Sequence, residues 1–330
     1  MKNVNLQTPI LVTGAGGFIG GHLVASLLQQ GFTRLRAVDI KPFHEWYQKF
    51  DVVDNRVLNL DLREACIESC DEMQMVYNLA ADMGGMGFIE LNKALCMLSV
   101  LTNTHMLLAA KECGVKHFFY SSSACVYNGE KQTDPHNMGL KEADAYPAMP
   151  EDGYGWEKLF SERMCRHFYE DFGIETRVAR YHNVYGPFGT YDGGREKAPA
   201  AICRKVIAAK MSGVHEIEIW GDGEQTRSFQ YIDDCVKGTQ MLMNSDIREP
   251  LNVGSNQMVT INQLVDIAEG FAGIKLKRKY KLDAPKGVRG RNSDNTLILK
   301  LLGWQPSISL EEGLEKTYGW IHDQMTVRQL

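Results

Sequence analysis

A tyrosine and a lysine one helical turn apart are the residues of this sequence best suited to redox chemistry. Tyr154 and Lys158 stand four residues apart, which puts both side chains on one face of a helix. A phenol titrates near about 10 in water, and a buried lysine cation favours the ionised form, which can take a proton from a substrate hydroxyl as hydride leaves. Tyr127 and Lys131 share this spacing but enclose Asn128-Gly129, a turn signal that predicts a break in the helix. We therefore expect Tyr154 to be the base and Lys158 its electrostatic partner.

A glycine-rich segment near the N-terminus has the form that binds a diphosphate. Thr13 to Gly20 (TGAGGFIG) directly follows an apolar run and directly precedes a helical pattern. In this setting Gly14 makes the turn, Gly17 lets the backbone approach a pyrophosphate, and Gly20 packs the helix on the strand. The N–H groups at the start of the helix then bind the anion. A tight strand-to-helix turn without a ligand is the alternative.

An acidic residue at the end of the next apolar run indicates which dinucleotide is bound. Asp39 lies roughly twenty residues after the glycines, where an acid accepts hydrogen bonds from the adenosine ribose hydroxyls and repels a 2′-phosphate. The sequence therefore predicts NAD rather than NADP, although Lys41 is nearby and Asp is also common at strand ends. Asp61 and Leu62 follow a third apolar run, Val57 to Leu60, and either line the adenine or form a plain loop.

Three consecutive serines, Ser121 to Ser123, end another apolar run. Ligands of parallel sheets bind at the carboxyl ends of the strands, so these hydroxyls are candidates for contacts with a substrate. Ordinary turn serines are an equally good interpretation of the residues alone.

The elements that position these residues alternate between strands and helices. Helical spacing is found in Phe18 to Gln30, Leu91 to Cys113 and Gly155 to Phe172, between short apolar runs. The apolar runs are Ile10 to Thr13, Leu35 to Asp39, Met75 to Leu79, His117 to Ser121 and Thr176 to Arg180. This alternation predicts a doubly wound parallel α/β sheet of the Rossmann type.

The pattern changes after about residue 186, where glycine and proline become frequent. A strand and a helix return near Phe229 to Met243, followed by a mixed tail. We expect a Rossmann domain formed by residues 1–180 and 229–256. A smaller interleaved α/β lobe formed by residues 181–228 and 257–330 would bind the substrate, with a ligand cleft between the two.

Composition excludes several classes of protein. The 330 residues allow about two domains. Lys and Arg number 36 against 41 Asp and Glu, a net charge of -5 that argues against binding to nucleic acid or an anionic membrane. Hydrophobic residues at 44% and charged residues at 23% are globular averages. No metal site is expected, because the eight cysteines are dispersed without zinc spacing.

The same features predict where the protein works. Dispersed cysteines indicate reduced thiols, and hence the cytosol. The N-terminus lacks a signal-peptide core, and no apolar run approaches the roughly 18 residues that span a membrane.

Taken in order, the motifs resemble those of the extended short-chain dehydrogenase/reductase family of nucleotide-sugar enzymes. They are the glycine turn, Asn78-Leu79-Ala80-Ala81, Ser123, Tyr154-x-x-x-Lys158 and Tyr185-Gly186-Pro187, and the similarity covers essentially the whole chain. Four further segments look like the members that invert carbons 3 and 5 of GDP-mannose, giving GDP-L-galactose and GDP-L-gulose. These segments are residues 81–87, 122–127, 193–199 and 288–294.

The resemblance implies a role for particular residues. Ser123, Tyr154 and Lys158 would carry the redox step, while Cys125 and Lys197 would exchange the carbon-bound protons. The residues expected to hold NAD are Gly14, Gly17, Phe18, Ile19, Gly20, Asp39, Asp61, Leu62, Leu79, Ala80, Ala81, Tyr154 and Lys158. Those expected to bind the GDP-sugar are Met83, Gly84, Gly85, Ser123, Cys125, Asn183, Lys197, Lys205, Gln225, Arg227 and Arg291.

The implied chemistry explains why a thiol and an amine are useful. Transient oxidation of carbon 4 makes the hydrogens on carbons 3 and 5 acidic, and inversion then needs proton-transfer groups on opposite sides of the ring. Cys125 lies two residues beyond Ser123, so in an extended chain both point to the same side. Cys125 as a small buried hydrophobe and Lys197 as a solvated loop lysine are the alternatives.

Other charged residues allow a functional and a plain interpretation. Arg289 and Arg291 could present a guanidinium fork to a diphosphate or be surface arginines. The basic run Lys275 to Lys281 is expected to be a solvated strand face. Composition predicts that the helix Leu91 to Ala110 is buried all round. The resemblance implies that this helix and the one from Tyr154 form a homodimer interface.

Two other functions remain open on the sequence. A carbon-4 epimerase or 4,6-dehydratase acting on a nucleotide sugar would use the same scaffold, but a dehydratase should offer a Thr-Asp or Thr-Glu arrangement where this chain has Ala124-Cys125. A non-catalytic NAD-sensing protein is the alternative of a different class. Such proteins generally lose the Tyr/Lys pair, which is intact here.

Overall fold

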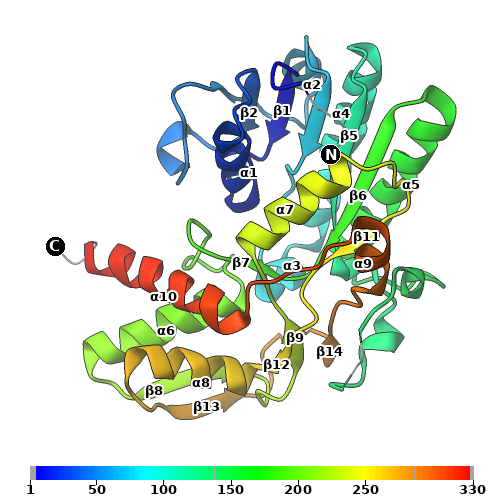
Figure 1. Ribbon diagram of the computed structural model, residues 1–330. Coiled ribbons are helices and arrows are strands. Elements are labelled where there is room, and N and C mark those ends of the chain that lie inside the picture. The colour runs from blue at the N-terminus through cyan, green and yellow to red at the C-terminus, as the bar shows by residue number, and fades with distance from the viewer. Residues whose placement is uncertain (1–4, 137–138, 286, 328–330) are drawn as a thin grey trace.

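The computed structural model describes residues 5–136, 139–285 and 287–327, and a seven-stranded parallel sheet forms its larger part (Figure 1). The strand order is β11-β6-β5-β4-β1-β2-β3. The order reverses between β1 and β4, the point at which such sheets bind ligands. The strands are β1 (Ile10–Thr13), β2 (Leu35–Asp39), β3 (Asp54–Val57), β4 (Met75–Asn78), β5 (His117–Ser123), β6 (Glu175–Tyr181) and β11 (Leu251–Val253).

Helices cover both faces of this sheet because alternate residues of its strands point to opposite sides. In β1, Ile10 and Val12 join one buried cluster while Leu11 joins the other. The helices α1 (Phe18–Gln29) and α7 (Ile232–Met243) pack together on the first face. On the second face α4 (Lys93–Glu112) packs between α2 (Arg63–Cys70) and α5 (Tyr154–Phe172). The Rossmann-type sheet predicted from the sequence is thus confirmed.

The remaining segments build a smaller α/β lobe at the carboxyl ends of the strands (Figure 1). Its helices α6 (Ala198–Ser212), α8 (Ile261–Ala272) and α10 (Leu310–Val327) pack together. Three small sheets accompany them: β13 (Lys277–Lys281) with β8 (Glu216–Trp220), β12 (Met258–Thr260) with β9 (Thr226–Ser228) and β14 (Gly290–Arg291), and β10 (Gln230–Tyr231) with β7 (Val184–Tyr185). Short connecting helices are η1 (Phe43–Glu45), α3 (Met86–Leu91), η2 (Ala124–Val126), η3 (Gly129–Gln132), η4 (Glu142–Ala145) and α9 (Thr296–Leu302).

Two expectations about single elements were wrong. The third strand ends at Val57 instead of beginning there, and its residues are exposed or half-buried, so its apolar neighbours gave a misleading signal. The helix α4 is not buried all round, because Leu95, Leu98 and Leu101 are 40%, 52% and 39% exposed. Only the side of α4 that faces α2, α5 and the sheet is covered.

Within the described residues, α4 also has the length and apolar composition of a membrane-crossing helix. It packs within the helix layer on the sheet, as core helices with this composition do. The domain division stays a prediction; the strands of the large sheet fall within residues 1–180 and 229–256 except for Tyr181, the last residue of β6.

Candidate active site

The glycine-rich turn lies where the strand order reverses, between the ends of β1 and β4. Gly14 has a positive φ of 67°, and a Cβ on it would lie 2.9 Å from the carbonyl carbon of Leu79. A Cβ on Gly20 would lie 2.1 Å from the carbonyl oxygen of Gly14. Side chains at either position would therefore separate β1 from its neighbours. The turn and packing roles predicted for these two glycines are confirmed.

The start of α1 has the features that a pyrophosphate requires. Gly17 is the N-cap, and among the described residues no side chain occupies the N–H groups of the first turn, which Phe18 and Ile19 begin. The backbone donors at this helix end thus remain available to an anion. Asp39 at the end of β2 is buried, and its Oδ1 accepts a hydrogen bond of 3.0 Å from the Lys41 N–H. The residues present fit a dinucleotide at this edge of the sheet.

Hydrogen bonds join the neighbouring strand ends into one platform. The Thr13 hydroxyl donates to Asn78 at 2.8 Å and accepts from the N–H groups of Leu79 and Ala80 at 3.1 and 3.2 Å. Ala81 follows in the same half-buried segment. Further along the edge, Asp61 accepts a 2.8 Å hydrogen bond from Thr102, and the exposed Leu62 is the N-cap of α2.

The tyrosine and lysine expected to perform the redox step lie side by side. Tyr154 begins α5, and both it and Lys158 are buried, at 5% and 2% exposure. The Lys158 Nζ lies 5.5 Å from the centre of the Tyr154 ring. Burial raises the pKa of the Tyr154 phenol well above 10; charge at Cys125 and at Glu157 adds to this, while a hydrogen bond with Ser123 lowers it. The expected depression of this pKa is therefore not found in the protein alone.

The thiol of Cys125 lies close to Tyr154, although the backbone that carries it is not extended as predicted. Residues Ala124–Val126 form the 3-10 helix η2 instead of an extended segment, because the Ser123 hydroxyl accepts a 3.2 Å hydrogen bond from the Cys125 N–H. Cys125 and Tyr154 nevertheless belong to one buried cluster, against which Met83 packs. The serine, thiol and phenol predicted from the sequence are brought together.

A buried arginine holds the thiol from the other side. Arg291 Nη1 lies 3.4 Å from Cys125 Sγ, Nη2 lies 3.3 Å from Glu151, and Nε donates to Gln132 at 2.7 Å. Burial, assisted by the charge of Glu151, raises the pKa of Cys125 to about 11, and Arg291 opposes the shift. The thiol therefore keeps its proton at neutral pH.

The side chain of Lys197 shares this electrostatic environment. Lys197 is the half-buried N-cap of α6, and burial lowers its pKa, whereas charge at Cys125 raises it. Burial thus disfavours the charged form of each group, the thiolate of Cys125 and the ammonium of Lys197. A thiol and a lysine shifted in this way are candidates for proton exchange with a carbon acid.

The loop after β4 lies against the segment that carries Lys197. Gly85 donates its N–H to the carbonyl of Arg195 at 3.0 Å, and Arg195 donates to the carbonyl of Met83 at 3.3 Å and pairs with Asp82. Gly84 lies in the same half-buried loop. The residues predicted to line the sugar and the predicted lysine are therefore neighbours.

Residues predicted to bind the nucleotide come from the smaller lobe. Gln225 is buried; its Nε2 donates to the carbonyl of Trp220 at 2.8 Å, and its Oε1 has no hydrogen-bond donor among the described residues. Burial, together with the nearby Arg291, lowers the pKa of Arg227 to about 9. Lys205 bonds the carbonyl of Glu218 at 2.9 Å. Asn183 has a positive φ of 45° and donates to the carbonyl of Ser228 at 3.1 Å.

The guanidinium fork proposed for Arg289 and Arg291 does not form. Arg289 lies near the surface and contacts both carboxylate oxygens of Asp222 at 3.0 Å. Arg291 is buried beside Cys125. Each arginine is held by a different acid, so the two do not face one anion.

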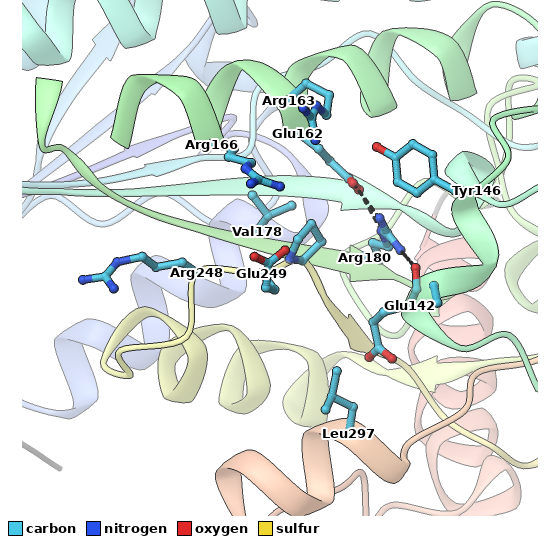
Figure 2. Close-up of a pocket in the computed structure, with 12 residues that line it drawn as sticks. Glu142, Tyr146, Glu162, Arg163, Arg166, Val178, Arg180, Arg248, Glu249 and Leu297 are labelled. Atoms are coloured by element: carbon cyan, nitrogen blue, oxygen red, sulfur yellow. Dashed lines mark hydrogen bonds and ion pairs between the residues drawn. The ribbon is translucent and has the colours of Figure 1, made fainter. Parts of the chain in front are cut away.

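A cavity of about 320 Å³ lies between α5, β6, η4 and the segment just before β11, and none of the predicted site residues lines it (Figure 2). In its wall Arg180 of β6 pairs with Glu162 of α5, with an Nη2 to Oε2 distance of 2.7 Å. Ser122 donates to the same carboxylate at 2.5 Å, and Arg180 also donates to the carbonyl of Glu142 at 2.7 Å. This network fixes α5 and the end of β5, and hence the separation of Tyr154 from the serines.

The sequence did not single out several acids and amides of the site. Gln132 and Glu151 orient Arg291, and Glu157 lies beside Lys158 at 3.6 Å. Spacing alone could have identified Glu157, which is three residues from Tyr154 and so on its face of the helix. Gln132 ends the short helix η3 and Glu151 lies in a loop, and neither segment is long enough to carry a periodic signal.

Comparison with known proteins shows which family and which solved structures this chain resembles. Residues 10–254 match the NAD dependent epimerase/dehydratase family. The chain is 47% identical to GDP-mannose 3,5-epimerase of Arabidopsis thaliana over 96% of its own length and 82% of that protein. Its structure resembles UDP-glucose 4-epimerase of Thermotoga maritima, solved with UDP-glucose, with a TM-score of 0.86 and 26% identity over 96% and 100% of the two chains. MoeE5 in complex with UDP-glucose and NAD gives a TM-score of 0.80 and 27% identity over 96% and 99%.

Proposed function

The chain belongs to the NAD dependent epimerase/dehydratase family, and on that basis we propose that it inverts carbons 3 and 5 of GDP-mannose. The products are GDP-L-galactose and GDP-L-gulose. One observation carries this proposal: a buried thiol, Cys125, packs in one cluster with Tyr154 and lies within electrostatic reach of the half-buried Lys197. A chain that acted only on carbon 4 would need the redox pair alone.

Bound NAD supplies a hydride acceptor for carbon 4 that is returned to its starting state at the end of each turnover. The glycine turn and the first turn of α1 hold the pyrophosphate, Asp39 holds the adenosine ribose, and Asp61 and Leu62 lie toward the adenine. Leu79 to Ala81 border the dinucleotide at the end of β4. Tyr154 takes the proton of the carbon-4 hydroxyl, Ser123 orients that hydroxyl, and Lys158 stabilises the phenolate.

Cys125 and Lys197 then act on the carbons next to the new carbonyl. Loss of a proton from carbon 3 or carbon 5 leaves a delocalised enolate, and inversion requires return of a proton from the other face. The thiol stands on the side of β5, whereas Lys197 approaches from the smaller lobe. Met83 to Gly85 border the hexose, and Asn183, Lys205, Gln225, Arg227 and Arg291 hold the GDP portion.

Solvent exchange tests this function directly. Purified protein is incubated with GDP-mannose in deuterated water, and the recovered sugars are examined by NMR. We expect deuterium at carbons 3 and 5 together with the two epimers. Recovery of GDP-mannose without label at either carbon would contradict the proposal.

A carbon-4 epimerase is the second candidate, because UDP-glucose 4-epimerase is among the chain's structural neighbours. Such an enzyme returns hydride to the opposite face of carbon 4 and leaves carbons 3 and 5 unlabelled. The same NMR spectra therefore separate the two functions, with UDP-glucose as the second substrate.

The protein is further proposed to act as a homodimer in the cytosol. Leu98 of α4 and Phe160 of α5 are 52% and 55% exposed on adjoining helices, and a second copy would cover them. All eight cysteines are free thiols, which suits a reducing compartment.

A further inference from the structure

A third titratable side chain, that of Glu157, accompanies Tyr154 and Lys158 at the start of α5. Glu157 directly precedes the lysine, yet its side chain points inward and the residue is only 3% exposed. A carboxylate is costly to bury unless it is paired or hydrogen-bonded. The contacts of Glu157 show which neighbours offset the free-energy cost of burying its carboxylate.

The two carboxylate oxygens of Glu157 have different surroundings. Oε1 accepts hydrogen bonds from the hydroxyls of Tyr120 at 3.1 Å and Ser161 at 2.9 Å. Oε2 accepts none from the described residues and lies 3.6 Å from the Lys158 Nζ. Two hydroxyls therefore fix one oxygen, while the other faces the ammonium.

The other groups around Lys158 do not supply a counter-charge. Its Nζ lies 4.8 Å from the centre of the Tyr120 ring of β5 and 5.5 Å from that of Tyr154. The thiols of Cys96 on α4 and Cys165 on α5 are also within reach of its charge, but burial raises the pKa of both, so they stay neutral. The next buried acid of the helix, Glu162, is paired with Arg180.

The position of Glu157 affects both members of the redox pair. A buried ammonium without a counter-charge gives up its proton at a lower pH. The negative charge of Glu157 also adds to burial in raising the pKa of Tyr154. One carboxylate thus acts in the same direction on the lysine and on the phenol.

We propose that Glu157 is a positioning residue of the redox step: its carboxylate keeps Lys158 charged in the buried site and sets the pH range in which Tyr154 works. It touches neither the hydride-accepting group nor the sugar. The inference relies on the proposed function only for the choice of substrate.

The test compares Glu157→Gln with Ser161→Ala in the NAD-loaded protein. Glutamine keeps an acceptor for Tyr120 and Ser161 but removes the charge, whereas Ser161→Ala removes a hydrogen bond to Glu157 and keeps the charge. The rate at which GDP-mannose reduces the bound NAD is measured by stopped-flow absorbance across the pH range. We expect both limbs of the pH–rate profile to move to lower pH by about one unit in Glu157→Gln and to stay in place in Ser161→Ala.

A purely structural role for Glu157 predicts a different result. Loss of packing or of bound NAD lowers the rate at every pH without moving the limbs, and that outcome in Glu157→Gln would overturn the proposal. If Glu157→Gln does not fold, Glu157→Asp is tested instead, because the side chain is shorter by one methylene and its charge lies farther from Lys158. It should move both limbs in the same direction by less, and unmoved limbs in that variant would also overturn the proposal.

The wild-type protein separates this proposal from the function assigned above. Absence of label from GDP-mannose in deuterated water counts against the assignment of GDP-mannose as the substrate, and not against the proposed role of Glu157. In that case UDP-glucose is used to reduce the bound NAD, and the same comparison of pH limbs is made.

Discussion

At the scale of single residues, the proposed proton exchange relies on a thiol and a lysine whose charged forms are both disfavoured by burial. The pKa of Cys125 is raised to about 11 and that of Lys197 is lowered, in both cases mainly by burial. Arg291 at 3.4 Å from the thiol is the group that eases formation of the thiolate. Burial therefore opposes a full ion pair between these two groups, because buried charges are costly to desolvate.

Removal of the thiol tests its place in the mechanism. In Cys125→Ala we expect deuterium incorporation at carbons 3 and 5 to fall by about a hundredfold or more, since a positioned proton-transfer group contributes about that much. Binding of GDP-mannose and reduction of bound NAD should persist, because the redox pair is untouched. NMR reports the label, and calorimetry reports the binding.

Cys113→Ala is the matched control, because that thiol is half-buried at the end of α4 and donates to the Ile67 carbonyl at 3.7 Å, away from the proposed site. It should exchange label like the wild type. Undiminished exchange in Cys125→Ala would remove the thiol from the mechanism.

How much of the site the sequence could predict depends on whether a residue belongs to a spaced motif. Tyr154 and Lys158 were found because helical periodicity relates them directly. The residues alone suggested Arg291 only as part of a fork that does not form, and its contact with Cys125 joins residues 166 positions apart in the sequence. No local pattern encodes such a contact, which is also why Gln132 and Glu151 were missed.

At the scale of elements, the strand–turn–helix at residues 10–29 shows how close packing builds a binding site. α1 begins so near the end of β1 that a Cβ on Gly20 would lie 2.1 Å from the Gly14 carbonyl oxygen. The neighbour is backbone, which cannot move aside as a side chain can. Because Gly20 has no side chain, the N-terminal end of α1 and its N–H groups can lie at the point where the strand order reverses.

Gly20→Ala should therefore cost both stability and cofactor. We expect destabilisation of about 1–3 kcal/mol from overpacking and a clear loss of NAD from the purified protein. Urea unfolding measures the first effect, and chromatography of the released nucleotide measures the second.

Gly270→Ala provides the comparison, since Gly270 lies within α8 and a Cβ there meets no atom within 4 Å. That change should stabilise the protein by up to about 1 kcal/mol and leave the NAD content unchanged. Equal effects of the two substitutions would show that the close approach at Gly20 does not matter.

The elements also show where sequence patterns stop being informative. β1, β2 and α1 follow from apolar periodicity within a residue or so of their bounds. The turn of η2 does not, because it depends on one hydroxyl, that of Ser123, which accepts the Cys125 N–H. β3 was displaced because an exposed edge strand lacks the buried alternation on which prediction depends.

At the scale of the whole molecule, the site draws on both parts of the chain. The sheet and α5 supply the serine, thiol, phenol and lysine, whereas the smaller lobe supplies Lys197, Arg227 and Arg291. Arg291 reaches back to Cys125, so the thiol is held by both parts. Alignment of the two parts is thus a condition for placing proton-transfer groups on opposite sides of a sugar.

The same helix that carries Tyr154 and Lys158 presents an uncovered apolar face on its other side. Trp156 and Phe160 are 42% and 55% exposed on α5, beside Leu95 and Leu98 of α4. Large apolar side chains gathered on two adjoining helices favour association with a second copy. A dimer formed there would hold α5 from outside while β5 holds it from inside.

A charge placed on this face tests the dimer. Phe160→Lys should convert a particle of twice the 37.2 kDa chain mass into one of single mass at micromolar concentration, as measured by sedimentation velocity. The reason is that an ammonium buried against apolar side chains costs several kcal/mol, more than most single interface contacts contribute. Val214→Lys is the control: Val214 is 58% exposed beyond the end of α6, and the variant should sediment like the wild type. A wild-type monomer, or a Phe160→Lys variant that stays dimeric, would show that this face has another use.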